Sequence, residues 1–262
     1  MKKGLVLLLL LSSLHCIAQR WEAEMMTGLT GYSGDLTQKL FAPRSVGAAT
    51  AFNIRYQLNY TVSVRAGILS GSIAGNDKYN ADAELKKRNL NFRSNIFETN
   101  LALEVNLLEP EYFFFYPYLF GGIGIYHFDP YTYNKTAQRV YLQPLGTEGQ
   151  GMAAYPDRKP YSLTQFCLPF GGGFKFNLSK RLDLAWELSG RYLFTDYLDD
   201  VSQTYVNMQA ISASARPEAA EMACRRQDNF VPREGDPRGN PKVKDWYYVS
   251  GFKLAVRLGG SR

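Results

Sequence analysis

The sequence has little cysteine and histidine, and its charge is nearly balanced. Three cysteines in 262 residues exclude a disulfide-stapled scaffold. The formal net charge of +6 is mild for this length and gives no case for a nucleic-acid partner. After the first residues no run of eighteen or more apolar residues occurs, which excludes a membrane-spanning helix.

The first eighteen residues have the pattern of a secretory signal peptide. Lys2 and Lys3 precede an apolar stretch, GLVLLLLL (4–11), and small residues follow as far as Ala18. This stretch is too short to span a bilayer, so we predict cleavage after Ala18 and a signal peptide at 1–18. Loss of the two lysines lowers the net charge from +6 to +4, because no acid leaves with them.

The remaining residues, 19–262, form one predicted domain with two cysteines. A lipoprotein would use Cys16, but His15 is too large for the position before a lipidated cysteine. Cys167 lies in a predicted strand and Cys224 in a long loop. A bridge between them is possible, and the sequence does not decide it.

What the sequence does contain is aromatic residues, glycine and two-residue alternation. Aromatics make up 14 % of the chain, and tyrosine is the commonest of them. The stretch LDLAWELSGRYLF (182–194) places large apolar residues on one face and Asp, Glu, Ser and Arg on the other. This pattern indicates a half-buried β-strand, whose apolar face meets either a protein core or lipid.

Eight segments have the length and pattern of strands that could cross a membrane. They are Trp21–Tyr32, Ser45–Gln57, Tyr60–Gly71, Ser94–Leu107, Tyr116–Phe128, Leu163–Leu178, Leu182–Tyr197 and Trp246–Leu258.

The links between these segments alternate strictly in length. The short links are 58–59, 108–115 and 179–181, and the long ones are 33–44, 72–93, 129–162 and 198–245. Outer-membrane barrels have short periplasmic turns and longer external loops, whereas a soluble sandwich has no reason to keep its short links at one end. We therefore predict an all-β fold, an eight-stranded antiparallel up-and-down transmembrane barrel, with a water-facing sandwich as the alternative.

The polar faces of the predicted strands carry equal numbers of acids and bases. The acids are Glu22, Glu24, Glu98, Glu104, Asp183 and Glu187, and the bases are Arg55, Arg65, Lys175, Arg191, Lys253 and Arg257. An eight-stranded barrel is just wide enough for side chains to fill it, and buried charges persist only with partners. These twelve residues are therefore predicted to form a structural charge network in the lumen.

Support for chemistry is weak. The one histidine after the signal peptide, His127, lies beside Asp129, but a catalytic relay also needs a convergent nucleophile. We predict no enzyme activity and no cofactor. Asp196, Asp199 and Asp200 could offer oxygen ligands to calcium, although their spacing fits no fixed loop pattern and acids at strand ends often cap turns.

Two other loops have a distinctive composition. The basic trio Lys86, Lys87 and Arg88 could contact lipopolysaccharide phosphates, or could simply be solvated. The last long loop, about 198–245, mixes arginines, acids, prolines and glycines, which is typical of a mobile segment with few core-forming residues. A surface adhesin, a lipopolysaccharide-binding barrel and a small-solute channel are the competing functions.

Several stretches together resemble one family, the PorG-like barrel components of the Bacteroidota type IX secretion system. They are RNLNFRSNIFETNLALEVNLL (88–108), YPYLFGGIGIYHFDP (116–130), LQPLGTEGQG (142–151), PYSLTQFCLPFGGGFKFNLSKR (160–181) and GRYLFTDYLDDVSQTYV (190–206). The resemblance implies a non-enzymatic outer-membrane component of this protein-export machine, which also supports gliding motility in motile relatives. Its partners would be outer-membrane lipid and a periplasmic ring made of a lipoprotein and its partner.

A periplasmic partner could reach only the short turns and the chain ends of such a barrel. We therefore expect docking residues in the turns, namely Glu109, Glu111, Tyr112, Lys180 and Arg181. The alternative is that these turns merely close hairpins.

Overall fold

The computed structural model describes residues 20–37, 45–214, 216, 218–228 and 230–258. The predicted signal peptide, residues 1–18, and the lipidation alternative at Cys16 both lie outside the described residues.

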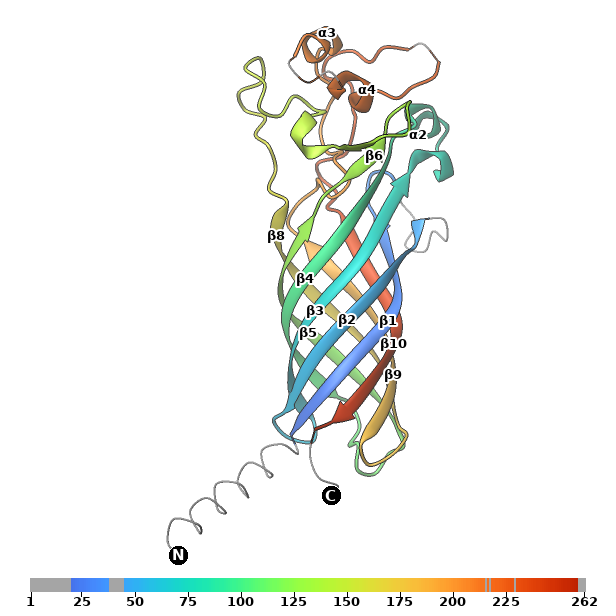
Figure 1. Cartoon of the computed structure of the whole chain (residues 1–262), viewed down its shortest axis with the longest axis vertical. Helices are drawn as coiled ribbons and strands as arrows, with labels where there is room; N and C mark the ends of the chain where they lie inside the picture. The colour runs from blue at the N-terminus through green and yellow to red at the C-terminus, as the bar shows by residue number, and fades with distance from the viewer. Residues whose placement is uncertain (1–19, 38–44, 215, 217, 229, 259–262) are drawn as a thin grey trace, which may run out of the picture.

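Eight antiparallel strands close into a barrel (Figure 1). They are β1 (Trp21–Ser33), β2 (Gly47–Gln57), β3 (Val62–Asn76), β4 (Asn91–Asn106), β5 (Phe115–Phe128), β8 (Thr164–Asn177), β9 (Leu182–Leu193) and β10 (Trp246–Arg257). The order β3-β2-β1-β10-β9-β8-β5-β4 returns on itself because β3 also pairs with β4. The predicted eight-stranded antiparallel barrel is therefore confirmed.

The first and last strands form one seam of this barrel. Their register runs from Glu22 opposite Arg257 to Ser33 opposite Trp246. β3 and β4 extend further than predicted, to Asn76 and from Asn91, and they pair along their full length. Backbone hydrogen bonds can continue a hairpin beyond the apolar wall, so the apolar pattern alone underestimated both strands.

The short and long links lie at opposite ends of the barrel (Figure 1). The turn end carries the links 58–61, 107–114 and 178–181, together with the start of β1 and the end of β10. The loop end carries the long links 34–46, 77–90, 129–163 and 194–245, whose described residues we call the outer cap. This arrangement follows the predicted alternation of turns and loops.

The outer cap contains regular structure that the sequence pattern did not indicate. It holds the hairpin of β6 (Tyr131–Tyr133) and β7 (Arg139–Tyr141), the 3-10 turns η2 (Asp77–Tyr79) and η3 (Gln143–Leu145), and the helices α2 (Ala83–Arg88), α3 (Met208–Ser212) and α4 (Ala219–Ala223). Within the described part of the chain, no helix has the length and apolar character needed to span a bilayer.

The helix α2 shows how local chemistry sets these elements. Asp82 accepts hydrogen bonds from the backbone N–H groups of Glu84 and Leu85, which would otherwise lack partners at the helix start. Asn89 ends the helix in the left-handed conformation, with φ of 59°.

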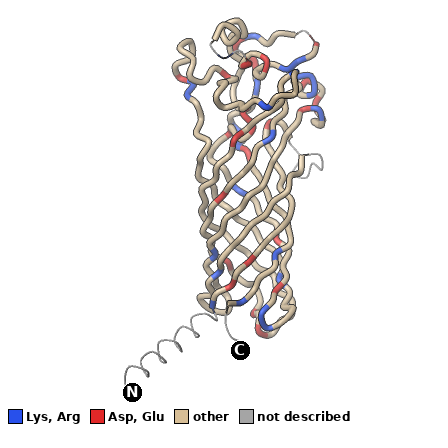
Figure 2. The backbone as a smooth tube through the Cα atoms, in the orientation of Figure 1, with Lys and Arg blue, Asp and Glu red and all other residues tan. Residues whose placement is uncertain are grey.

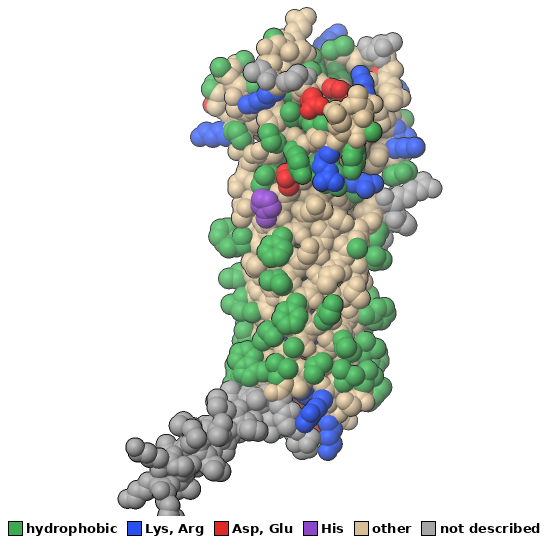
Figure 3. Space-filling view, in the orientation of Figure 1, with side chains coloured by type: hydrophobic (Ala, Val, Ile, Leu, Met, Phe, Trp, Pro, Cys, Tyr) green, Lys and Arg blue, Asp and Glu red, His purple; other side chains and the backbone are tan. Residues whose placement is uncertain are grey.

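The outward faces of the strands are apolar and the inward faces polar. On β4, Phe97, Leu101 and Leu103 are more than half exposed, whereas Glu98 and Glu104 are buried. Hydrophobic side chains project around the wall on the face shown in Figure 3, and Lys and Arg gather at the two ends. Exposed apolar surface on this scale would not be stable in water. The sandwich alternative is therefore wrong, and the chain is a small barrel of the outer-membrane type.

Two aromatic clusters mark the edges of this wall. Near the turn end, Phe174 stacks with Phe115, with ring centroids 5.2 Å apart, and with Trp186, with ring centroids 6.3 Å apart. Near the loop end, Tyr192 and Trp246 meet edge to face at 5.3 Å. Aromatic girdles of this kind lie at the two interfaces of a membrane, so they bracket the span.

The last loop, about 198–245, was predicted to hold few core-forming residues, and this prediction is wrong for its described part. Its described residues Val206, Ile211, Ala219 and Ala223 form a buried cluster, because α3 and α4 pack against each other. Leu198, Val201 and Met222 join the core that continues down into the barrel. The loop lacks strand periodicity because its apolar residues are spaced to fit this packing, not a sheet.

Candidate functional site

Charged side chains fill the interior of the barrel from its turn end up to the pair Glu98–Arg191, which lies toward the loop end. All twelve predicted lumen residues take part in at least one ion pair: Glu22, Glu24, Glu98, Glu104, Asp183 and Glu187 with Arg55, Arg65, Lys175, Arg191, Lys253 and Arg257. Figure 2 shows acidic and basic positions at intervals along the strands. Strand register places these groups opposite one another, as between Glu22 and its neighbour Arg55 on β2.

Glu104 is the most connected acid of this network. Its carboxylate accepts a hydrogen bond from Arg55 at 3.0 Å, lies 3.5 Å from Arg65 and also binds the ammonium of Lys175. Each of these four side chains is at most 5 % exposed. Taking charges out of water is costly, so these groups persist because they neutralise each other.

Tyrosine hydroxyls complete the network, and sequence reasoning missed them. Tyr118 donates to Glu187 at 2.7 Å, and Glu187 also binds Arg65 at 2.7 Å and Lys253 at 2.6 Å. The inward position of Tyr118, two residues from Phe120 on β5, is the sequence signal that would have found it.

Toward the loop end, large apolar and aromatic side chains pack around the last charged pair, and the Tyr247 hydroxyl donates to Glu98 at 2.5 Å. Tyr126, Phe128, Leu193 and Tyr247 are fully buried, and they belong to the same core cluster as Leu198 of the outer cap. A barrel of eight strands has room for side chains and little else. The lumen is thus a packed interior from its turn end to its loop end.

The outer cap closes the loop end through two buried arginines. Arg238 donates to Glu148 at 3.0 Å and to the carbonyl of Asp200 at 2.6 Å. Arg88 binds Asp77 at 2.7 Å and also donates to the carbonyl of Arg238.

Arg88 further donates to the carbonyl of Asp35 at 3.0 Å, so the two guanidinium groups join all four long links. Arginine suits this role because its five donors are fixed in one plane. The cap is therefore a single packed unit over the barrel mouth.

The acids of the cap are held mostly by hydroxyl and N–H donors. Asp200 accepts from the Tyr161 hydroxyl at 2.7 Å and from Thr147, while Asp199 accepts from Tyr32 and from the Val201 N–H. Burial raises the pKa of Asp200 to about 6, against the opposing charge of Arg238.

Burial likewise raises the pKa of Asp196 to about 7. The described residues contain no group of three His, Cys, Asp or Glu side chains placed to hold a metal ion. The calcium alternative at Asp196, Asp199 and Asp200 therefore has no geometric support.

His127 is exposed on the outward face of β5, and its Nδ1 lies 3.0 Å from the Thr164 hydroxyl. The predicted neighbour Asp129 is one residue beyond the strand. Cys167 is buried in β8, Cys224 is partly buried after α4, and both are free thiols, which decides the disulfide question against a bridge.

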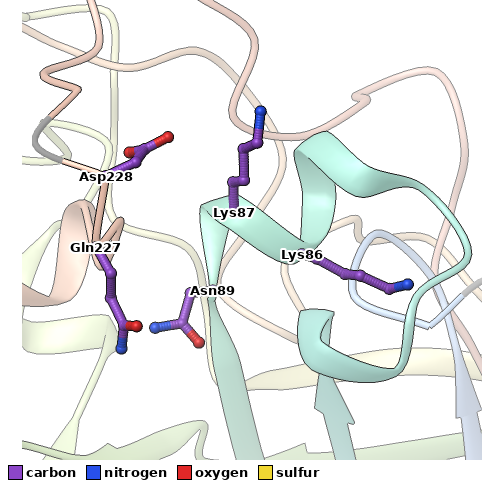
Figure 4. A pocket seen from close by; sticks show the side chains of 5 residues that line it. All are labelled: Lys86, Lys87, Asn89, Gln227 and Asp228. Carbon is purple, nitrogen blue, oxygen red and sulfur yellow. The ribbon is translucent and has the colours of Figure 1, made fainter.

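The basic trio of the second long link does not form one surface. Arg88 is buried against Asp77, which removes it from solvent. Lys86 and Lys87 line a hollow of about 360 Å³ with Asn89, Gln227 and Asp228, shown in Figure 4. There the two lysine side chains point apart, so a joint phosphate contact by all three bases is excluded.

The predicted docking residues lie together at the turn end. Glu109, Glu111 and Tyr112 are exposed in the β4–β5 turn, and Lys180 and Arg181 are exposed in the β8–β9 turn. Tyr112 is 76 % exposed. The two turns are neighbours because β5 pairs with β8.

The contact between these turns is direct. The Asn177 side chain at the end of β8 donates to the carbonyls of Pro110 and Phe113 at 2.8 and 3.0 Å. The acidic and the basic turn thus form one continuous surface.

Comparisons with known proteins identify a family and similar folds. The family described as "Domain of unknown function (DUF6089)" matches residues 2–213, and no curated protein matches the sequence. Neisserial surface protein A is 9% identical, with 90% of this chain and 96% of that chain covered and a TM-score of 0.46. Ail, the attachment invasion locus protein of Yersinia pestis, is 9% identical over 90% and 97%, with a TM-score of 0.39. OprG from Pseudomonas aeruginosa is 11% identical over 91% and 97%, also with a TM-score of 0.39.

Proposed function

The chain belongs to the DUF6089 family, and we propose that it is a non-enzymatic outer-membrane anchor of a protein-export machine of the type IX class. In this role the barrel fixes a periplasmic ring, built from a lipoprotein and its partner, to the membrane. The signal peptide at 1–18 would deliver the chain to the membrane.

The observation that carries the proposal is the sealed interior. Paired charges fill the lumen from the turn end to the Glu98–Arg191 pair, aromatic side chains pack around and above that pair, and Arg88 and Arg238 tie the cap over the mouth. A barrel that is packed from end to end favours a rigid platform over a passage for solutes or folded proteins.

The surface offered to a periplasmic partner is compact and chemically mixed. One turn carries exposed acids and the exposed Tyr112 ring, and the neighbouring turn carries exposed bases. An exposed aromatic flanked by charges is typical of a protein-binding surface, where the ring supplies contact area and the charges supply specificity. The sequence resemblance to PorG-like barrels suggests the identity of the partner.

The test is a variant in which Lys180→Glu and Arg181→Glu are combined with Tyr112→Ala. We expect ring components to be lost from gentle detergent extracts, and cargo with a C-terminal signal domain to remain in the periplasm. The matched control is Lys86→Glu with Lys87→Glu, which reverses two charges at the opposite end of the barrel. Normal ring co-purification by the triple variant, with the barrel folded, would contradict the proposal.

A second candidate, a surface adhesin, is favoured by the ordered outer cap. Phe230 and Val231 are 51% and 67% exposed on the cap, and a folded loop surface binds at lower entropic cost than a mobile one. Replacing residues 226–236 by a glycine–serine linker would abolish adhesion in this case and leave secretion intact. The turn variant and the loop replacement therefore distinguish the secretion anchor from the adhesin.

A further inference from the structure

We propose that the barrel wall holds the acyl chain of an anionic phospholipid, whose headgroup has a net negative charge, in a groove over β9 between β8 and β10. The groove has a volume of about 710 Å³ and is lined by Phe170, Leu188, Gly190, Trp246 and Lys244, among others. It lies on the lipid-facing side of the barrel, just below the outer cap.

One missing side chain creates the groove. Phe170 on β8, Gly190 on β9 and Tyr248 on β10 lie in register, and Gly31 on β1 follows Tyr248. The Tyr248 ring leans over Gly31, since a Cβ added there would lie 1.9 Å from its Cζ. Because the Tyr248 ring leans away toward Gly31, the space above Gly190 is open on that side. On the other side Phe170 forms its wall.

A Cβ placed on Gly190 would meet nothing closer than Phe170 at 3.4 Å, so the floor of the groove is free. This apolar groove continues the wall that already faces lipid, and Leu188 extends it toward the centre of the membrane. A hydrocarbon chain fits such a surface, because the groove exposes almost only apolar atoms.

The loop end of the groove supplies the complementary charge. Lys244 lines it directly and Lys242 is exposed two residues earlier; among the described residues neither forms a salt bridge, and the charge of Lys244 also acts on the Asp196 carboxyl. Trp246 and Tyr192 of the aromatic girdle set this end at the level of the lipid headgroups. An ammonium at headgroup level above an apolar groove matches a lipid phosphate above an acyl chain.

The test uses quenching of tryptophan fluorescence by brominated lipids. Trp21→Phe and Trp186→Phe leave Trp246 as the only indole, because the chain has three tryptophans. This protein is reconstituted in phosphatidylcholine bilayers that contain a minor fraction of either brominated phosphatidylglycerol or brominated phosphatidylcholine. We expect the anionic lipid to be enriched about fivefold at Trp246, the preference that one basic residue near a membrane surface provides.

Two further variants separate the parts of the site. Lys244→Gln should abolish the preference for the anionic lipid, whereas Lys86→Gln, a matched change elsewhere in the cap, should preserve it. Gly190→Leu should fill the groove and reduce quenching by both lipids. The folding of each variant is checked on a gel, where the folded barrel migrates differently from the unfolded chain. Equal quenching by the two lipids in the parent protein, or unchanged quenching in folded Gly190→Leu, would overturn the proposal.

Discussion

The lumen and the outer cap both bury charged side chains, and they stabilise them differently. In the lumen six acids meet six bases, each held on a strand whose register fixes its neighbours. The cap has the buried ion pairs Arg88–Asp77 and Arg238–Glu148, but its Asp199 and Asp245 share the Tyr32 hydroxyl, accept backbone N–H groups and, among the described residues, form no salt bridge.

The difference shows that complete pairing of opposite charges depends on regular strand register. A regular sheet repeats its inward positions at fixed distances, so a sequence can place opposite charges side by side across strands. Irregular loops lack this lattice, and they satisfy buried carboxylates with whatever donors the chain brings nearby. The lumen is therefore expected to resist pH changes that loosen the cap.

The largest effect should follow from removing the central acid of the lumen. Glu104→Leu leaves Arg55, Arg65 and Lys175 buried with too little negative charge, which should lower the free energy of unfolding by about 3–5 kcal/mol. This free energy is measured by denaturant unfolding in lipid vesicles, with gel mobility as the readout of the folded fraction. Adding Lys175→Met should recover part of the loss, and a single variant as stable as the parent would refute the network.

A smaller effect should follow from Arg238→Met in the cap. Losing its bonds to Glu148 and to the Asp200 carbonyl removes charge-assisted hydrogen bonds, so amide exchange in 198–206 should accelerate by about tenfold or more. Exchange in the barrel strands should not change. Arg233→Met, at an exposed position of the same loop, is the control, and equal acceleration by both variants would show that Arg238 is no tie.

The cap should also loosen as the pH rises. Asp196 and Asp200 have folded pKa values of about 7 and about 6, above the ordinary value of 3.8, because burial disfavours their charged forms. The folded cap thus binds protons more tightly than the unfolded chain, so this stabilisation is present below about pH 4 and is lost as pH rises through 6 to 7.

Amide exchange in the cap, corrected for its intrinsic pH dependence, should therefore increase several-fold between pH 5 and pH 8. Asp196→Asn should flatten the profile. A profile that stays unchanged in this variant would remove Asp196 as a cause, and a parallel change in the strands would erase the contrast with the lumen.

The smallest effect is expected at the surface of the cap. Lys87 pairs with Glu84 at 2.7 Å on the exposed face of α2, where water and salt screen the attraction. Lys87→Gln should leave amide exchange in the cap unchanged within error. A loosening as large as that from Arg238→Met would mean that surface pairs also hold the cap.

Strand number, order and the alternation of turn lengths could be predicted because a two-residue repeat is a local signal. The lumen residues follow from the same repeat, since parity alone assigns Glu98 and Glu104 to one face of β4. The hydrogen-bonded hydroxyl of Tyr118 was missed. Tyr118 lies on the inward face of β5, but it is uncharged, so the sequence pattern did not assign it to the charge network.

The cap could not be predicted in the same way. Its apolar residues, such as Ile211 and Met222, pack against segments far away in the chain and follow no period. α2 and α3 do have local signals that were overlooked: Asp82 precedes a helix-forming stretch with basic residues at its end, and Asn207 caps the start of α3. The burial of Arg88 depends on Asp35 and Arg238, and no local pattern predicts such a contact.

The seam between β1 and β10 constrains how this protein is made. Until the segment 246–257 arrives, the free side of β1 has no partner for its backbone groups, and hydrocarbon provides none. If the hairpins inserted one at a time, the unpaired edge of β1 would be exposed to the hydrocarbon of the membrane. The incomplete sheet therefore needs to be shielded from lipid until β10 pairs with β1. Barrel closure should accordingly occur in one step, when β10 pairs with β1. Chains truncated before residue 246 should fail to insert into the membrane.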